Sequence, residues 1–413
     1  MIRRTVLILT AAASSGCFNF DGAYAQYCDG GRCSPDSGAF GGSGGGATGG
    51  AMGGGGGGGG GATGGGGAAF DAGCQQFLCP QLDWMSPRSS IAYSVAPGLM
   101  TESLNRFHVI ASFEANAPGS SNYTHFEYRF VDGGVMSITR TNQFDPRTET
   151  RQLRGVSMTD YLVTYRTYAT RFENSASPVD FTGCTLADGG VSSPYHYAVA
   201  PVSADEFWMV GFPMSICHWT RGGGLVSAND PDSNSKVYYQ DVYRTPTGEV
   251  YAVGGTYDSS SGTASGAISR ADGVPVSFSP LVDAWYDDGF NSIDGAGALV
   301  YVLGRSNSQS RGEIQQLRPD GGFEVAYTAP FRLAQLDVMP TGEVWAVGAA
   351  SDRVVYFDGG TWGDFVLPTT EFRTSVRWEN INGTNEGVIL TGFETQEDGG
   401  KTAIVNTYRR FGK

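Results

Sequence analysis

The chain has 413 residues and a formal net charge of −14, with 27 Lys and Arg against 41 Asp and Glu. A protein that holds a nucleic-acid backbone needs a basic face, so this charge balance excludes nucleic acid as the expected partner. The sequence also contains no apolar run of the roughly 20 residues that a membrane-spanning helix requires. An anionic surface of this kind instead keeps a protein soluble.

The first residues follow the order of a secretory signal peptide. Arg3 and Arg4 precede an apolar run, Val6–Ala13, and the small residue Gly16 comes after it. A positive segment, a short apolar segment and a small residue at the cleavage site define such signals. The sequence therefore predicts a signal peptide over residues 1–16 and an exported mature chain.

The residues Ser14–Cys17 resemble the lipobox of bacterial lipoproteins. The resemblance implies that Cys17 becomes the first residue of the mature chain and carries a lipid, which would anchor the protein to a membrane, at the outer membrane or cell surface. Ser14 departs from the leucine that is usual at that place. Ordinary cleavage near Ala23 or Ala25 is the alternative, and it predicts a secreted or periplasmic protein.

The cysteines that follow Cys17 are even in number, as expected of disulfides in an oxidising compartment. They are Cys28, Cys33, Cys74, Cys79, Cys184 and Cys217. The simplest pairing of the first four joins Cys28 to Cys33 and Cys74 to Cys79, but four cysteines allow three connectivities. A zinc site made of all four thiolates is the alternative, because the spacings suit that metal. For Cys184 and Cys217 we expect a disulfide that staples neighbouring strands.

Residues 41–70 are almost entirely glycine with some Ala, Thr and Ser. Such a segment loses too much backbone entropy on folding and has few side chains to bury, so we expect a flexible linker. Residues 17–40 form a separate segment between the lipidated cysteine and this linker. Residues 17–33, followed by the linker, resemble the mature N-terminus of lipoproteins that are common in myxobacteria. This resemblance implies a location and no activity.

Residues 80–413 form the predicted folded domain. From about residue 90 the content of aromatic and β-branched residues rises, and Asp-Gly and Gly-Gly pairs separate short apolar runs. This pattern is typical of antiparallel hairpins. No long helical periodicity interrupts it, so we predict an all-β domain.

An apolar strand recurs along the domain. Five copies end in glycine, and these glycines are 43, 50, 44 and 44 residues apart: Phe207–Gly211, Val250–Gly254, Val300–Gly304, Val344–Gly348 and Val388–Gly392. Two earlier copies lack the glycine: Phe107–Ala111 and Tyr161–Tyr165. Seven units of about 45 residues with several strands each are typical of a β-propeller. We therefore predict a seven-bladed β-propeller, in which each apolar strand packs on both faces and the glycine ends it at a turn.

Two segments resemble motifs of known propeller families. Val250–Tyr257 resembles the double-glycine strand of kelch repeats, and Asp358–Trp362 resembles the Asp box of sialidase-type propellers. Both motifs are structural in their families. The resemblance therefore implies a kelch- or WD-like propeller and no catalytic residues.

A propeller ring closes when one blade takes strands from both ends of the domain. Ile91–Ala96 and Ala403–Tyr408 are both short β-rich runs near those ends. We expect these two segments to pair in the closing blade.

The histidines do not form a recognisable catalytic or metal motif. They are His108, His125, His196 and His218, and neither H-E-x-x-H nor G-x-S-x-G occurs in the sequence. We expect His108 and His218 to be buried and hydrogen-bonded, and His196 to lie on an inner strand. Three acids, Asp241, Asp294 and Asp337, recur at similar places in their units, which favours a structural role. Trp285, Tyr286 and Trp378 are candidates for an aromatic binding platform.

One segment has the alternation of a calcium loop. Asp230, Asp232 and Asn234 place oxygen ligands at every second residue, and Asp241 stands at the twelfth position. Calcium prefers several oxygen ligands from one tight turn. Ser235 replaces the glycine that is usual at the sixth position, and the closing residue is Asp instead of Glu, so a plain polar loop is favoured. We therefore expect no cofactor, and Ca²⁺ bound by this loop is the alternative.

The expected function is that of a cell-surface lipoprotein which presents a propeller as a binding module for a protein or a carbohydrate. The alternative is a hydrolase or lyase that acts on a polysaccharide in the central channel of the ring. A hydrolase of that kind needs two carboxylates across a cleft. Because no catalytic motif is present, the non-enzymatic function is favoured.

Overall fold

The computed structural model describes the residues of the folded unit between Gly67 and Lys413 that form its strands and several of its turns. These are residues 77–85, 95–114, 123–132, 134–139, 150–165, 168–173, 179–182, 195–212, 216–228, 237–258, 263–271, 279–280, 289–306, 310–349, 351–368, 376–395 and 400–410. Every regular element in these ranges is a β-strand. The all-β prediction is therefore confirmed. Within the same ranges, no helix is long and apolar enough to cross a membrane.

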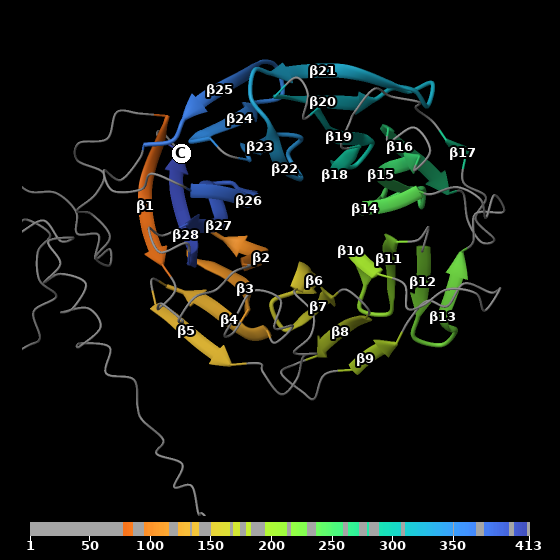
Figure 1. Cartoon of the computed structure of the whole chain (residues 1–413), viewed down its shortest axis with the longest axis horizontal. Helices are drawn as coiled ribbons and strands as arrows, with labels where there is room; N and C mark the ends of the chain where they lie inside the picture. The colour runs from red at the N-terminus through yellow and green to blue at the C-terminus, as the bar shows by residue number, and fades with distance from the viewer. Residues whose placement is uncertain are drawn as a thin grey trace, which may run out of the picture. The chain divides into compact units, whose positions relative to one another are not determined.

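The strands form seven sheets of four strands each, arranged as blades around a ring (Figure 1). Blade 1 consists of β2 (Val95–Ser103), β3 (Arg106–Glu114), β4 (Tyr123–Val131) and β5 (Gly134–Thr139). Blade 2 consists of β6 (Thr150–Ser157), β7 (Asp160–Tyr165), β8 (Tyr168–Glu173) and β9 (Val179–Thr182). Blade 3 consists of β10 (Tyr195–Ser203), β11 (Glu206–Phe212), β12 (Ile216–Thr220) and β13 (Gly224–Ala228). Blade 4 consists of β14 (Val237–Arg244), β15 (Val250–Asp258), β16 (Thr263–Ala271) and β17 (Ser279–Pro280). Blade 5 consists of β18 (Phe290–Ala296), β19 (Leu299–Ser306), β20 (Arg311–Leu317) and β21 (Phe323–Ala329). Blade 6 consists of β22 (Leu333–Val338), β23 (Val344–Gly348), β24 (Arg353–Phe357) and β25 (Trp362–Val366). Blade 7 consists of β26 (Val376–Thr384), β27 (Gly387–Thr395), β28 (Lys401–Arg410) and β1 (Leu78–Met85).

The first strand of each blade lies at the centre of the ring. These inner strands are β2, β6, β10, β14, β18, β22 and β26, and each contacts the inner strand of the next blade, with β26 contacting β2. The ring is therefore closed, and the predicted seven-bladed propeller is confirmed.

The predicted apolar repeat is the second strand of every blade. In β15, Val250, Ala252 and Val253 have no exposed surface, and Tyr251 is 1% exposed. The run is apolar without alternation because both of its faces pack against neighbouring blades. Burial on both faces is the main source of stability in this fold.

In blade 6 the repeat glycine ends its strand, as predicted, because β23 ends at Gly348. In blades 4 and 7 its role differs from the predicted one, because β15 and β27 run past Gly254 and Gly392. A Cβ on Gly254 would lie 1.8 Å from the carbonyl oxygen of Tyr238, and one on Gly392 would lie 2.1 Å from that of Arg377. Opposite each glycine the inner strand has a register shift. The glycine is therefore required because a bulged inner strand approaches it closely.

The Asp-Gly turns form hairpins, as predicted, where the structure describes them. Gly321 and Gly359 have φ values of 87° and 95°, which glycine adopts without strain. In the second turn Oδ1 of Asp358 accepts hydrogen bonds from the amides of Gly360 (2.8 Å) and Thr361 (2.7 Å). Gly273, in another predicted turn, lies outside the described residues.

The closing blade takes strands from both ends of the domain, as expected, but the predicted N-terminal segment was wrong. β1 pairs antiparallel with β28, with Trp84 opposite Val405. Residues 95 and 96 instead belong to β2, the inner strand of blade 1, and residues 91–94 lie outside the described part of the chain. β1 was not predicted from the sequence because it contains Pro80, and proline is unfavourable in a strand unless the strand lies at an edge. β1 is such an edge strand, and it begins just before the predicted domain boundary at residue 80.

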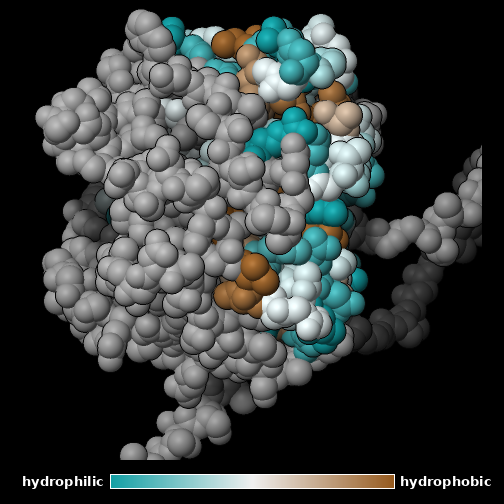
Figure 2. Space-filling view, turned by 90° about the vertical axis from the view of Figure 1, so that its right-hand side faces the viewer, coloured by the Kyte–Doolittle hydropathy of each residue, from teal (hydrophilic) through white to brown (hydrophobic). Residues whose placement is uncertain are grey.

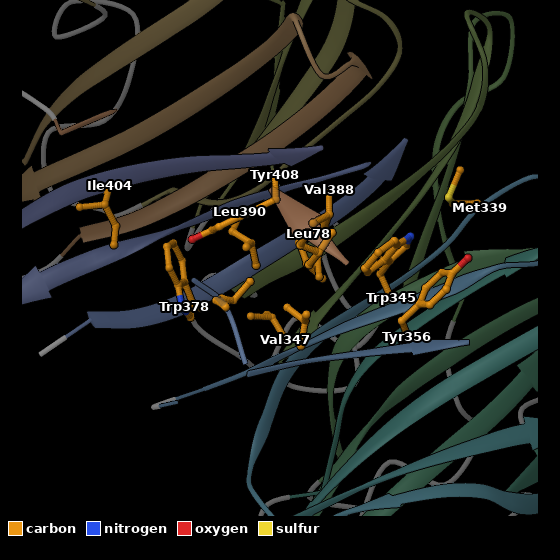
Figure 3. Packing of buried hydrophobic residues seen from close by; sticks show 13 residues of the cluster. Leu78, Met339, Trp345, Val347, Tyr356, Trp378, Val388, Leu390, Ile404 and Tyr408 are labelled. Carbon is orange, nitrogen blue, oxygen red and sulfur yellow. The ribbon is translucent and has the colours of Figure 1, made fainter. Parts of the chain in front are cut away.

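A large hydrophobic cluster joins blades 6 and 7 (Figure 3). Trp345 and Val347 of β23 face Trp378, Val388 and Leu390 of blade 7, with Leu78 of β1 among them. Trp378 is 4% exposed. The suggestion that Trp378 contributes to a surface binding platform was therefore wrong, because this indole fills the space between two blades. Trp285 and Tyr286 lie outside the described residues.

Candidate functional site

Each inner strand pairs antiparallel with the second strand of its own blade, and this register allows the inner strands to be compared position by position. The comparison defines two layers of side chains at the centre of the ring. The first layer consists of Gly98, Gln152, Ala198, Asp241, Ser292, Gln335 and Asn380. The second layer lies two residues further along and consists of Met100, Arg154, Ala200, Tyr243, Asp294, Asp337 and Asn382. The residue between the layers is apolar in every blade, as period-two alternation of a strand requires.

Polar side chains of the first layer bind the backbone of the next blade. Oε1 of Gln152 accepts a hydrogen bond from the amide of Val199 at 2.7 Å. Oδ2 of Asp241 accepts one from the amide of Ile293 at 3.1 Å. An inner strand has one edge without a strand partner, and its buried amides need acceptors. The first layer therefore supplies bonds that a neighbouring strand would otherwise make.

The second layer repeats this arrangement one step further along the strands. Oδ2 of Asp294 accepts a hydrogen bond from the amide of Val338, and Oδ2 of Asp337 accepts one from the amide of Gly383, both at 2.8 Å. Nδ2 of Asn382 also donates to Oδ1 of Asp337 at 2.9 Å. Each of these carboxylates therefore ties its own blade to the following one.

Asp241 is surrounded by donors on both oxygens. Oδ1 accepts from the amide of Val242 (2.9 Å) and from Nε2 of Gln152 (3.2 Å). Oδ2 accepts from Ile293 and from Oγ of Ser292 (3.4 Å). A carboxylate has about four acceptor positions, so those of Asp241 are taken by protein donors.

This environment bears on the predicted calcium loop. Asp241 lies on β14 at 3% exposure, with its oxygens bonded to neighbouring blades. Asp230, Asp232 and Asn234 lie outside the described residues, and the described residues contain no group of three or more His, Cys, Asp or Glu that could hold a metal ion. The calcium loop stays a prediction.

Arg154 of blade 2 provides the positive charge at the centre. We call Arg154, Asp241, Asp294 and Asp337 the central cluster. Burial lowers the pKa of the guanidinium most strongly, but the three aspartates together outweigh burial and raise that pKa. The acids come from blades 4, 5 and 6, while blades 1 and 3 beside Arg154 carry Met100 and Ala200 in the same layer. The arginine therefore interacts with carboxylates on other blades rather than with a neighbour on its own sheet.

Asp294 and Asp337 form a carboxyl pair. Asp294 accepts the amide of Val338, the residue after Asp337, so two carboxyl groups of like charge are neighbours in the second layer. Burial, followed by the charge of Asp337, raises the pKa of Asp294 to about 7, although Arg154 opposes this shift. Burial also raises the pKa of Asp337. Two neighbouring buried carboxyl groups favour a state in which one of them keeps its proton.

A second polar group lies between blades 1 and 2. Glu127 of β4 has no exposed surface. It accepts a hydrogen bond from Oη of Tyr161 at 3.0 Å, forms an ion pair with Arg129, and lies 3.6 Å from Nδ1 of His108. Because its partners come from both blades, this group holds the two sheets together.

His108 is buried, as expected, at 3% exposure, and His125 has no exposed surface. The side chain of His218 is 17% exposed, so the expectation that it is buried was wrong in part. Nε2 of His218 lies 3.1 Å from Oε1 of Glu206, and its ring stacks on Trp208 with centroids 4.2 Å apart. His196 lies on the inner strand β10. The structure gathers none of the described histidines into a metal-binding group.

Two of the predicted disulfide cysteines lie in described strands. Cys79 is on β1 and Cys217 is on β12, at 3% and 0% exposure. The partners predicted for them, Cys74 and Cys184, lie outside the described residues. Cys17, Cys28 and Cys33 also lie outside, so lipidation and the disulfide pairing stay predictions.

The exposed surface of the described strands is mostly hydrophilic. Figure 2 shows one side of the molecule, where hydrophobic residues of the described part occur in small separate groups. The large exposed hydrophobic residues come from different elements and are Val131, Met136, Val156, Val226, Val325 and Val366. Single exposed apolar residues are normal on a soluble surface.

The geometry of the central cluster does not match a two-carboxylate hydrolase. Such enzymes hold their carboxyl groups roughly 5–9.5 Å apart, with substrate or water between them. Asp294 and Asp337 instead each accept a backbone amide of the following blade. Sequence reasoning identified the three aspartates but missed Arg154, Gln152 and Glu127. Gln152 and Arg154 alternate with the apolar Leu153. Alignment of this segment on the repeat would have placed Gln152 and Arg154 on an inner strand.

Comparisons with known proteins support the fold and do not define a family. No family model matches the chain, and no curated protein matches it. Among solved structures, YCF48 bound to D1 peptide superposes with a TM-score of 0.53 at 12% identity, covering 83% of this chain and 99% of that chain. Virginiamycin B lyase from Staphylococcus aureus gives a TM-score of 0.55 at 11% identity, covering 79% and 98%.

A third similar structure is the extracellular domain of a putative hybrid two-component system from B. thetaiotaomicron. Its TM-score is 0.50 at 14% identity, over 79% of this chain and 39% of that chain. Identities this low show a shared fold alone. The chain is therefore a seven-bladed β-propeller similar in fold to proteins of different functions.

Proposed function

We propose that this protein is a cell-surface lipoprotein whose seven-bladed propeller is a binding module for a protein partner. The observation that carries the proposal is the use of the central acids. Asp241, Asp294 and Asp337 each accept a backbone amide from the next blade. A side chain that closes the ring in this way is poorly suited to acid–base chemistry on a substrate.

The structural neighbours are consistent with binding. YCF48 was solved with a D1 peptide, and another neighbour is an extracellular domain of a putative signalling protein. Fold alone does not determine function. Carbohydrate binding is the closest alternative, and an aromatic platform including Trp285 and Tyr286 would support it.

An enzyme remains the rival function, and one observation favours it. Burial raises the pKa of Asp294 to about 7, a property that catalytic carboxyls share with structural ones. One of the structural neighbours is also a lyase by name. The enzyme hypothesis predicts that the protein turns over a polysaccharide and that the Asp294→Asn variant loses this activity.

The lipid anchor is tested on cells that produce the full chain. Mass spectrometry of the mature N-terminus is expected to find a lipid on Cys17, and the Cys17→Ser variant is expected to leave the membrane fraction. A mature chain that begins near Ala23 or Ala25 without lipid would contradict the anchor and leave the binding proposal intact.

Binding is tested by photo-crosslinking of the full chain on the cell surface. A crosslinking amino acid replaces Asp205, an exposed residue in a turn on one face of the ring, or Val325, which is 54% exposed on the outer strand β21. A probe placed at Trp285 samples a segment outside the described residues. The probe at Val325 is the control. The expected result is a discrete protein adduct from the probe at Asp205 or at Trp285 and none from the probe at Val325. Turnover of polysaccharide without any adduct would instead support the enzyme.

A further inference from the structure

The hydrogen bonds of Asp294 and Asp337 connect three successive blades. Asp294 on β18 accepts the amide of Val338 on β22, at 2.8 Å. Asp337, one residue before Val338, accepts the amide of Gly383 on β26, also at 2.8 Å. Because Val338 directly follows Asp337, the two carboxyl groups are neighbours. A change in this pair is therefore transmitted to blades 5, 6 and 7 at once.

Two neighbouring carboxyl groups in a buried site do not readily both ionise, because their like charges repel each other. Asp294 is 8% exposed, so water cannot readily stabilise a second charge beside Asp337. Burial and the neighbouring charge keep the pKa of Asp294 near 7. The proton is therefore present in mildly acidic solution and is lost just above neutrality.

The charged groups around the pair come from blades 2 and 4. Arg154 on β6 lowers the pKa of both carboxyls and keeps the shift from becoming larger. Asp241 and Tyr243 lie on β14, which packs against β18. The charge of Asp294, after burial, contributes to raising the pKa of Tyr243 to about 12. β26, on the other side of the pair, contributes the neutral amide of Asn382.

We propose that Asp294 and Asp337 form a proton-operated clasp that holds blades 5, 6 and 7 together at the centre of the ring. With one proton on the pair, the two carboxyl groups do not repel each other, and each binds the amide of the next blade. Without it, two like charges lie side by side in a poorly hydrated site, and this part of the ring loosens. The propeller is then most firmly closed in mildly acidic surroundings.

The direction of the pH effect follows from proton binding. The folded state holds a proton that the unfolded chain has already released between about pH 4 and pH 7, because an unfolded aspartate has a pKa near 3.9. Stability therefore falls as the pH rises through this range. The unfolding equilibrium constant is expected to increase up to about tenfold per pH unit, and to level off above about pH 7.

The test is chemical unfolding of the full chain between pH 5 and pH 8.5, for the wild type and Asp294→Asn. In the variant the amide carbonyl still accepts from Val338, and the side chain carries no charge at any pH. The variant is expected to lose most of the pH slope and to unfold at higher denaturant than the wild type at pH 8.5. Equal slopes in the two proteins would overturn the clasp.

Two further measurements complete the design. Asp364→Asn removes a carboxylate that pairs with Arg353 on the outer part of blade 6, and it is expected to keep the wild-type slope. If Asp294→Asn does not fold, infrared spectroscopy of the native wild type reads the pair directly. A protonated carboxyl band at pH 5.5 that vanishes by pH 8.5 supports the clasp, and no such band at either pH overturns it. None of these readouts needs a ligand, so they stand apart from the proposed binding function.

Discussion

Phe77, the residue before β1, stacks on Phe365 of blade 6 with ring centroids 4.3 Å apart. Its ring also lies 5.2 Å from that of Tyr356. β1 belongs to blade 7, so Phe77 reaches from the outermost strand of the closing blade to the neighbouring blade. The ring is therefore closed both by the ladder between β1 and β28 and by an aromatic contact beyond the end of that ladder.

Phe77→Ala is expected to destabilise the protein by about 1–3 kcal/mol, since truncation of a fully buried Phe costs about 3–5 kcal/mol and Phe77 is only partly buried. Urea unfolding measures the change. Val325→Ala removes an exposed side chain and is the control, with an expected effect below about 0.5 kcal/mol. Equal effects of the two substitutions would show that the aromatic contact does not contribute to closure.

Removal of β1 is expected to open the ring. A chain that lacks residues 17–66 keeps β1 and is expected to melt within about 2 °C of the wild type. A chain that lacks residues 17–85 exposes one edge of β28 and part of the cluster around Trp345 and Trp378, and a fall of more than about 10 °C is expected. Calorimetry distinguishes the two cases, and similar melting temperatures would contradict closure by β1.

Gly254→Ala tests the close approach of the bulged inner strand. A Cβ at this position would lie 1.8 Å from the carbonyl oxygen of Tyr238, so backbone must move. We expect a loss of about 3 kcal/mol or more, or failure to fold. Gly222→Ala is the matched control, because a Cβ there meets nothing within 4 Å, and it is expected to change stability by less than about 0.5 kcal/mol.

Arg154→Met removes the positive charge of the central cluster while keeping most of the side-chain volume. The three aspartates then lose the cation that lowers their pKa values. A loss of about 3 kcal/mol is expected at pH 8, and a smaller loss at pH 5, where protonation relieves the repulsion. Unfolding at both pH values checks this. Arg221→Met, at an arginine whose side chain is 55% exposed, is the control and is expected to leave the free energy of unfolding almost unchanged at either pH.

The sequence predicted the blades because the second strand of each blade is buried on both faces. Burial imposes an apolar run at a regular period, as in Val250–Gly254 and Val344–Gly348. The closing strand β1 carried no such signal, because an edge strand tolerates a proline such as Pro80 and only its first two residues are fully buried. A single-copy strand cannot be found from a repeat.

The central cluster was predictable in part for a related reason. Asp294 and Asp337 recur at the same register position, which indicated a structural role, and the interblade hydrogen bonds agree with it. The involvement of Arg154 was not predictable from spacing, because its side chain acts across the ring on blades that are distant in sequence. Such contacts depend on the three-dimensional ring, and one sequence pattern does not encode them.

The most direct test of the central claim compares the wild type and Asp294→Asn in the surface photo-crosslinking experiment, at pH 6 and with folding verified by circular dichroism. If the central carboxyls hold the ring together and the propeller binds a protein through its surface, the folded variant will give the same adduct at wild-type yield. A folded variant that loses a measurable turnover of polysaccharide, in a chain that gives no adduct, would contradict the binding module and identify the central cluster as a catalytic site.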